Sequence, residues 1–232
     1  MKKSFLIQGL LLFCFSSIYA QDPEIVRIKA GQDPATSYSQ NGFYMFPYFS
    51  EGVAVFKKGE KITARFNYHI LNDEIQFISL NGDTLALADP FSIKYITIDS
   101  SLFYYSEGYL EVILINENIM LARKLKLNTT TEKIGAYGQT SPSGSIRTPN
   151  RVIMGNTGKD LTINQDLIIQ KEYTYFWLDK YTTVLKANKS NLLKLLAPDK
   201  KSSIEEYLKK NKIDFRKESD LKKLLQFSLA SS

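Results

Sequence analysis

Apolar and polar side chains alternate along residues 41–128, and short turn signals separate the alternating runs. The clearest run places Ile62, Ala64, Phe66 and Tyr68 on one side and Thr63, Arg65, Asn67 and His69 on the other. Strict alternation is typical of a β-strand with one face in the core and one in water. The region therefore predicts sequential antiparallel strands, either as an open meander or curled into a sandwich or barrel.

Turn residues divide this β module into hairpins. Lys58-Gly59 separates "GVAVF" from "ITARFNYHI", and Asn81-Gly82-Asp83 separates "EIQFISL" from "TLALA". Glycine and asparagine tolerate the positive φ angles of tight hairpin turns. A further turn is predicted at Ser100-Ser101, and the tripeptide at 116–118 should join the strands "YLEVILI" and "IMLARKLKL".

The segments on either side of the β module have a different character. Residues 21–40 are polar and predict a mobile N-terminal arm with one short strand at Ile25–Ile28. Residues 129–150 are rich in Ser, Thr, Gly and Pro, which favours a loop or linker. Strands resume within residues 151–187 as "LTINQDLIIQ", "YTYFWLD" and "YTTVLKA", where Trp177 is interpreted as a packing residue.

Residues 188–232 have a helical pattern and a basic surface. One helix should end at Pro198, a second should begin at Ser203, which stands at capping-box spacing from Glu206, and a third should begin at Ser219. Fourteen large apolar or aromatic residues fall within residues 190–229, too many for a solvated tail. We therefore expect an α+β fold in which two to three short C-terminal helices pack on the sheet.

The first twenty residues are typical of a bacterial secretory signal peptide. A basic start, Lys2 and Lys3, precedes an apolar run from Phe5 to Phe15 that is too short to span a bilayer, and small and polar residues follow up to Ala20. We expect cleavage after Ala20 and a periplasmic or extracellular protein with no transmembrane segment. Cys14 follows Phe13 instead of the small residue that a lipoprotein signal requires, so the mature chain should contain no cysteine.

The charge distribution narrows the class of partner. The chain of 232 residues is 44% hydrophobic, which is enough for a packed core. Residues 186–225 contain 12 basic and 6 acidic residues, whereas residues 21–185 contain 16 and 18. A basic excess confined to the end of an exported chain favours an anionic envelope component or another envelope protein as partner, and not a nucleic acid.

Candidate chemistry is sparse. His69 is the only histidine and lies close to Asp73 and Glu74, but we interpret this stretch as a solvated strand end followed by a turn, in which His69 is dispensable. One histidine without a cysteine excludes a structural zinc site and an HExxH site. We therefore assign no catalytic, cofactor-binding or metal-ligating residue and expect no cofactor.

Three stretches carry a resemblance. "QFISLNGDTLALADP", "KIGAYGQTS" and "KANKSNLLKLLAPDKKSSIEEYLKKNKIDFRKESDLKKLL" are similar, in this order, to a group of uncharacterised exported proteins from Bacteroidetes. The resemblance implies a source and a compartment but no functional residue. Asp83-Thr84-Leu85 also resembles the short acceptor of O-linked glycans in Bacteroidetes, which leaves glycosylation of Thr84 open.

Two functions from different classes follow. The first is a non-catalytic binding or interaction module of the cell envelope. The second is a hydrolase that uses two carboxylates on an extracellular polymer. A concave site with two close, partly buried acids favours the hydrolase, and a sheet whose polar residues are satisfied by each other favours the binding module.

Overall fold

The computed structural model describes residues 25–33, 37, 44–116, 118–134, 140–145 and 165–230. The expected signal peptide, with Cys14 and the cleavage site after Ala20, lies outside the described residues, as do residues 146–164. Within the described ranges no helix is long and apolar enough to cross a membrane.

The described strands form one 12-stranded sheet in which every pairing is antiparallel. The strands are β1 (Ile25–Ile28), β2 (Ser50–Phe56), β3 (Lys61–His69), β4 (Glu74–Ile78), β5 (Thr84–Ala86), β6 (Ile93–Ile98), β7 (Ser101–Tyr105), β8 (Tyr109–Asn116), β9 (Ile119–Ile134), β10 (Thr140–Ser145), β11 (Asp166–Asp179) and β12 (Val184–Lys186). Their order is β1-β11-β9-β8-β7-β6-β2-β3-β4-β5, with β10 on β9 and β12 on β11. The predicted antiparallel sheet is confirmed, but the sheet is not closed into a barrel.

The predicted hairpin turns lie where the turn residues place them. Gly59 joins β2 to β3 with φ +94°, and Gly82 joins β4 to β5 with φ +89°. The next turn falls at Asp99-Ser100, one residue before its predicted place, because Asp99 takes the left-handed conformation. Thr84 is exposed on β5, at the edge of the sheet.

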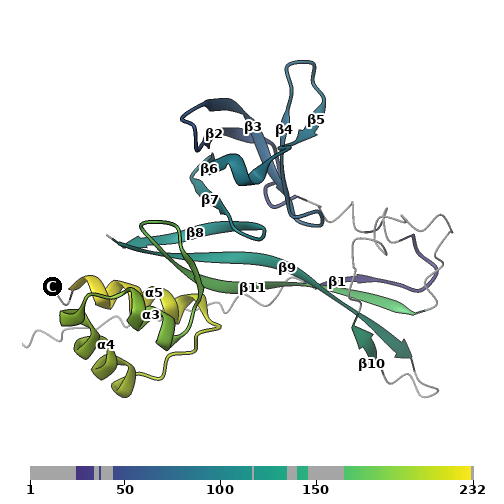
Figure 1. The fold of residues 1–232 in the computed structure, drawn as a ribbon. Helices are drawn as coiled ribbons and strands as arrows, with labels where there is room; N and C mark the ends of the chain where they lie inside the picture. Colours follow the sequence, from purple (N-terminus) through teal and green to yellow (C-terminus); the bar gives the residue numbers. More distant parts are fainter. Residues whose placement is uncertain are drawn as a thin grey trace, which may run out of the picture.

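Strands β9 and β11 are the longest elements and pair over 14 residues (Figure 1). The predicted loop at residues 129–150 is therefore wrong for 129–134, which continue β9, and for 140–145, which form β10. The run of three threonines from Thr129 to Thr131 explains the error: it reads as polar, but β-branched side chains favour strands. The two strands predicted between 161 and 179 are one strand from Asp166 onwards.

Three helices follow the sheet: α3 (Lys189–Leu195), α4 (Pro198–Lys210) and α5 (Glu218–Ala230). The predicted start of α4 at Ser203 is wrong, because the helix begins at Pro198, whose fixed φ suits the first helical position. Ser203 lies inside the helix and donates its hydroxyl to the carbonyl of Lys200. Asn188 caps α3 by accepting the Asn191 amide at 2.8 Å.

The helices cover one end of the β9–β11 ribbon, and β1 and β10 lie near its other end (Figure 1). Trp177 of β11 is fully buried there, as predicted for a packing residue, and its indole donates to the Asn188 carbonyl. The helical side chains around it include Leu192, Leu221 and Leu224, each fully buried. The sheet and the helices therefore share one apolar core at this end.

Strand β3 departs from the one-sided pattern that its sequence suggests. Its last four residues, Phe66–His69, are all buried, so both faces are covered. Asn67 is 1% exposed and bonds to the backbone of Phe46 and Tyr48 in the segment before β2. The predicted polar face is therefore interior at Asn67 and His69, because the Asn67 amide satisfies the backbone of the segment that lies over it.

Candidate functional site

The carboxylate of Asp73 stands where the β3–β4 turn meets β8 and β9. Its Oδ1 atom accepts the Tyr68 hydroxyl at 2.8 Å and the Tyr109 amide at 3.1 Å. Its Oδ2 atom lies 3.0 Å from Nζ of Lys124, a residue of β9. One side chain thus joins the end of β3 to β8 and β9, which lie more than 30 residues further along the chain.

Lys124 completes this junction. Its ammonium group, on a side chain that is 14% exposed, also donates to the carbonyl of Glu107 in the β7–β8 turn. Asp73 (φ 54°), Glu107 (φ 49°) and Gly108 (φ 116°) all adopt left-handed conformations around it. Non-glycine residues rarely hold such angles, and they gather at functional or tightly constrained positions.

Gly108 is required by the same geometry. A Cβ atom added there would overlap Nζ of Lys124 and Oδ2 of Asp73. A side chain would therefore displace the ion pair in addition to straining a backbone with positive φ. The ion pair and the turn depend on each other.

Asp73 also marks the point at which β8 separates from β9. The Tyr109 amide, in the first residue of β8, donates to Asp73, and the ladder between the two strands begins two residues later at Glu111 and Arg123. Strand β10 pairs with β9 only from Thr130 onwards. Among the described strands, none pairs with residues 124–129 of β9 on this side.

A cavity of about 270 Å³ lies at this unpaired edge. One wall is the β3–β4 turn and the other is β9. The lining residues are Ile70, Leu71, Asn72, Asp73, Lys124, Leu125, Lys126 and Leu127. Four apolar and four polar residues thus line one cavity, and Lys126, which is exposed, forms no ion pair with any described residue. Such a mixed lining suits an amphipathic ligand.

The two tyrosines beside Asp73 act as donors and not as bases. Burial, reinforced by the neighbouring Asp73 carboxylate, raises the pKa of Tyr68 far above its usual value. Burial likewise raises the pKa of Tyr109, with Tyr105 and Asp73 adding to the effect. Both phenols therefore stay protonated near neutral pH, and the Tyr68 hydroxyl serves as a fixed hydrogen-bond donor.

His69 is the last residue of β3 and directly precedes Ile70 of the cavity lining, but it does not line the cavity itself. The side chain is 6% exposed, so the predicted solvated strand end is wrong. Its Nδ1 atom accepts the Asn72 amide at 3.2 Å, and its ring packs edge-on against Tyr44 with centroids 5.1 Å apart. Burial lowers the pKa of His69 despite the nearby Glu74. The imidazole thus fixes the β3–β4 turn as a neutral acceptor.

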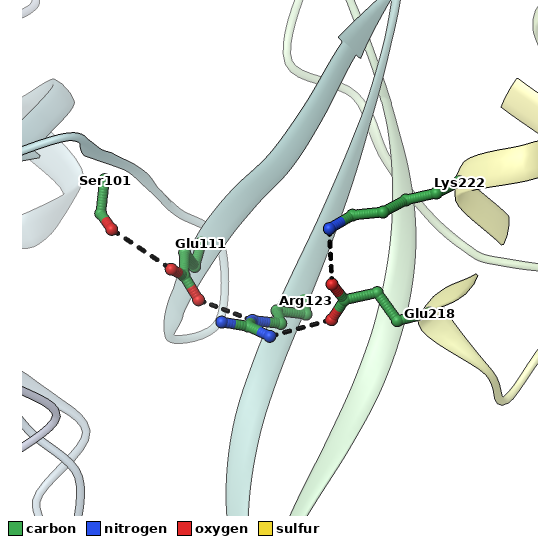
Figure 2. A network of polar contacts seen from close by, with 5 residues as sticks. All are labelled: Ser101, Glu111, Arg123, Glu218 and Lys222. Atoms are coloured by element: carbon green, nitrogen blue, oxygen red, sulfur yellow. Dashed lines mark hydrogen bonds and ion pairs between the residues drawn. The ribbon is translucent and has the colours of Figure 1, made fainter. Parts of the chain in front are cut away.

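A second polar cluster joins the sheet to the helices (Figure 2). Arg123 of β9 donates to Glu111 of β8 at 2.6 Å and to Glu218 of α5 at 2.9 Å. Lys222 contacts the other oxygen of Glu218 at 2.7 Å, and Ser101 donates to Glu111. The guanidinium also lies over the Tyr173 ring, 4.5 Å from its centroid.

The charges of this cluster compensate each other. Burial alone would raise the pKa of Glu218, but Lys222 and Arg123 together lower it below its usual value. Glu218 is therefore ionised at neutral pH, and both carboxylates contact the same guanidinium. A glycosidase needs one carboxylic acid that keeps its proton, and the lowered pKa of Glu218 is the opposite of that requirement.

The described residues contain no group of three or more His, Cys, Asp or Glu side chains that could hold a metal ion. No protein-family model, curated protein or solved structure matches the chain. The inferences that follow therefore rest on the residues themselves.

The sequence places Asp73 in the predicted turn after His69 and assigns it no further role. The sequence gave no sign of a site at Lys124, Gly108 or Tyr109, since each is of a type that is common in strands or turns. One pattern in the sequence was available: Asp73 and Gly108 each stand in a short turn close to a tyrosine. Only the strand order brings them together.

Proposed function

We propose that the protein is a non-catalytic binding module of the bacterial cell envelope, exported by a signal peptide that is cleaved after Ala20. The observation that carries this proposal is the cavity at the edge of β9 with which no described strand pairs. It combines apolar side chains from both walls with the ammonium of Lys126, which forms no ion pair with a described residue. Its acidic residue, Asp73, is engaged by Lys124, Tyr68 and Tyr109. Such a site can hold a ligand, and its one carboxylate is already engaged.

The contrasting candidate is a carboxylate hydrolase, and Glu111 and Glu218 are two acids that Arg123 brings together. Both are held by Arg123, and Glu218 is also held by Lys222. Two carboxylates that share the same cations support a fold and not proton transfer. The binding module is therefore the better proposal.

A photo-crosslinking experiment in the bacterial host tests this function. A photoreactive residue at position 126 lies at the cavity, and one at position 209, on the exposed side of α4, serves as the matched control. We expect a discrete crosslinked product from position 126 only. Equal products from both positions, or none from 126, would contradict a ligand site at the cavity.

Two further measurements test the remaining parts of the proposal. N-terminal sequencing of the exported protein should find Gln21, whereas a lipid-modified Cys14 would contradict the cleavage site. Purified protein should release no product from envelope polysaccharides. Hydrolysis that is lost in Glu111→Gln and Glu218→Gln, while both variants remain folded at the assay temperature, would establish the hydrolase instead.

A further inference from the structure

The edge of β9 offers backbone hydrogen-bonding groups beside the cavity. One side of β9 is paired with β11 without interruption from Ile119 to Glu132. On its other side, residues 124–129 face no described strand. Successive backbone groups of a strand point alternately to its two sides, so this stretch presents N–H and C=O groups to the cavity. An unpaired edge of this kind is a template for another strand.

The length of the cavity matches a short extended segment. Four consecutive residues of β9, 124–127, form one wall, and four consecutive residues of the β3–β4 turn, 70–73, form the other. Strand residues rise about 3.3 Å each, so the wall extends about 13 Å and admits about four ligand residues. The edge strand β5 offers no comparable site, because it has three exposed residues and no part in the cavity.

The side chains of the wall indicate the composition of the segment. Leu125 and Leu127 point to one face of β9 and Lys124 and Lys126 to the other. The leucines belong to apolar clusters that include Ile70 and Leu71 of the opposite wall. Lys124 is already paired with Asp73, so Lys126 is the charge that remains for a ligand. Cross-strand neighbours are favoured when apolar groups meet apolar groups and opposite charges meet.

We propose that an extended peptide segment, with acidic residues alternating with apolar ones, binds as an added strand to β9 between β8 and β10. This inference rests on the proposed function and names its ligand class. Asp73 is a positioning residue in this arrangement, because it takes the Tyr109 amide and holds β8 away from the edge.

Fluorescence anisotropy with the full chain tests the strand addition. The probe is a labelled, capped hexapeptide of alternating valine and glutamate. One matched peptide carries N-methyl groups at alternate residues, and another carries lysine in place of glutamate. We expect the first peptide to bind at least about tenfold more tightly than either control, since the N-methyl groups remove backbone hydrogen bonds and lysine reverses the charge that meets Lys126.

Two variants with the same change in charge locate the binding. Lys126→Glu should weaken the glutamate peptide about tenfold or more and improve binding of the lysine peptide. Lys209→Glu, on α4, should change neither affinity. Both residues are exposed, so both variants should keep the melting temperature of the parent chain.

Three outcomes overturn the inference. Equal affinity for the N-methylated peptide would show that backbone pairing is absent. A lack of binding by every peptide, together with crosslinking from position 126, would exclude a peptide ligand while leaving the proposed function in place. Dimers that the peptide does not dissociate, measured by sedimentation, would assign the edge to a second copy of the chain.

Discussion

At the residue scale, burial changes the protonation behaviour and the role of His69. Its folded pKa is lowered, so the unfolded chain binds the proton more readily than the folded one. The stability contributed by the neutral imidazole is fully present above the unfolded pKa of about 6.5 and is lost as the pH falls toward the folded pKa. The groups that face it are Tyr44, the Asn72 amide and the Glu74 carboxylate.

His69→Ala should therefore change both the stability and its pH dependence. At pH 7.5 the free energy of unfolding should fall by about 1–3 kcal/mol, because the Asn72 amide loses its acceptor in a buried turn. In the parent chain stability should fall between pH 7 and pH 5, and this slope should be smaller in the variant. Urea denaturation at several pH values measures both effects, and an identical slope in the two proteins would contradict this account.

Gly108 gives a second prediction for a single residue. Gly108→Ala should destabilise the protein more than Gly59→Ala, although both glycines have positive φ. An alanine at position 59 adds only backbone strain, about 1–2 kcal/mol, because no atom lies within 4 Å of its Cβ. An alanine at position 108 also displaces the Lys124–Asp73 pair. Thermal unfolding compares the two, and equal losses would show that the ion pair contributes nothing.

Residue roles were the least predictable part of the molecule. Alternation placed Asn67 and His69 on a solvated face, yet both are buried, because residues 44–49 lie over that face. Periodicity describes one strand and its own sheet, and it carries no information on which distant segment lies across it. The junction of Asp73 with Lys124 was invisible for the same reason.

At the element scale, predictions succeeded where the local chemistry decides the outcome. Gly59 and Gly82 fixed two hairpins because few residues tolerate their backbone angles. Predictions failed where pairing with a distant strand determines the local structure. Thr129–Thr131, for example, pairs with β11 in spite of its polar composition. The start of α4 at Pro198 was missed because a proline that ends one helix can also begin the next.

The ion pairs of Glu218 with Arg123 and Lys222 give a prediction for the contact between α5 and the sheet. Because the folded pKa of Glu218 is lowered, its contribution is present above the unfolded pKa of about 4.3 and is lost as the pH falls through the folded pKa. Glu218→Gln should cost about 1 kcal/mol at pH 7 and progressively less below pH 4.

Glu206→Gln is the matched control for this measurement. Glu206 pairs with Lys210 on the exposed side of α4, where ion pairs contribute little. The Glu206→Gln substitution should therefore leave the melting temperature nearly unchanged, both at pH 7 and below pH 4. If the two variants behaved alike, the cluster in Figure 2 would have no special role in holding α5.

At the scale of the whole molecule, the β9–β11 ribbon connects two packed regions. The helices cover one end around Trp177, and the β3–β4 turn packs Leu71 against Leu167 and Ile169 toward the other. The expected α+β organisation with C-terminal helices is confirmed. The cavity lies along β9 beyond the start of β8, so its shape depends on where the β3–β4 turn rests on the ribbon.

The helices should be an integral part of the fold and not a detachable tail. A chain that ends at Ala187 would expose Trp177, Leu121 and Ile119, which are at most 5% exposed in the intact protein. Each large apolar side chain brought into water costs about 1.5–3 kcal/mol, and a domain is stable by only about 5–15 kcal/mol. The shortened chain should therefore aggregate or unfold, with its tryptophan emission shifted to longer wavelength.

A milder substitution keeps this prediction testable in a folded protein. Leu224 is fully buried in α5 and Gln226, two residues later, is exposed. Leu224→Ala should lower the free energy of unfolding by about 2–5 kcal/mol, whereas Gln226→Ala should change it by less than about 0.5 kcal/mol. Asn116 of β8 donates to the Leu225 carbonyl and to Ser228, so the loss should appear in a single transition of sheet and helices together. Two separate transitions, or a chain ending at Ala187 that stays monomeric with a melting temperature close to that of the parent, would show that the helices are an independent unit.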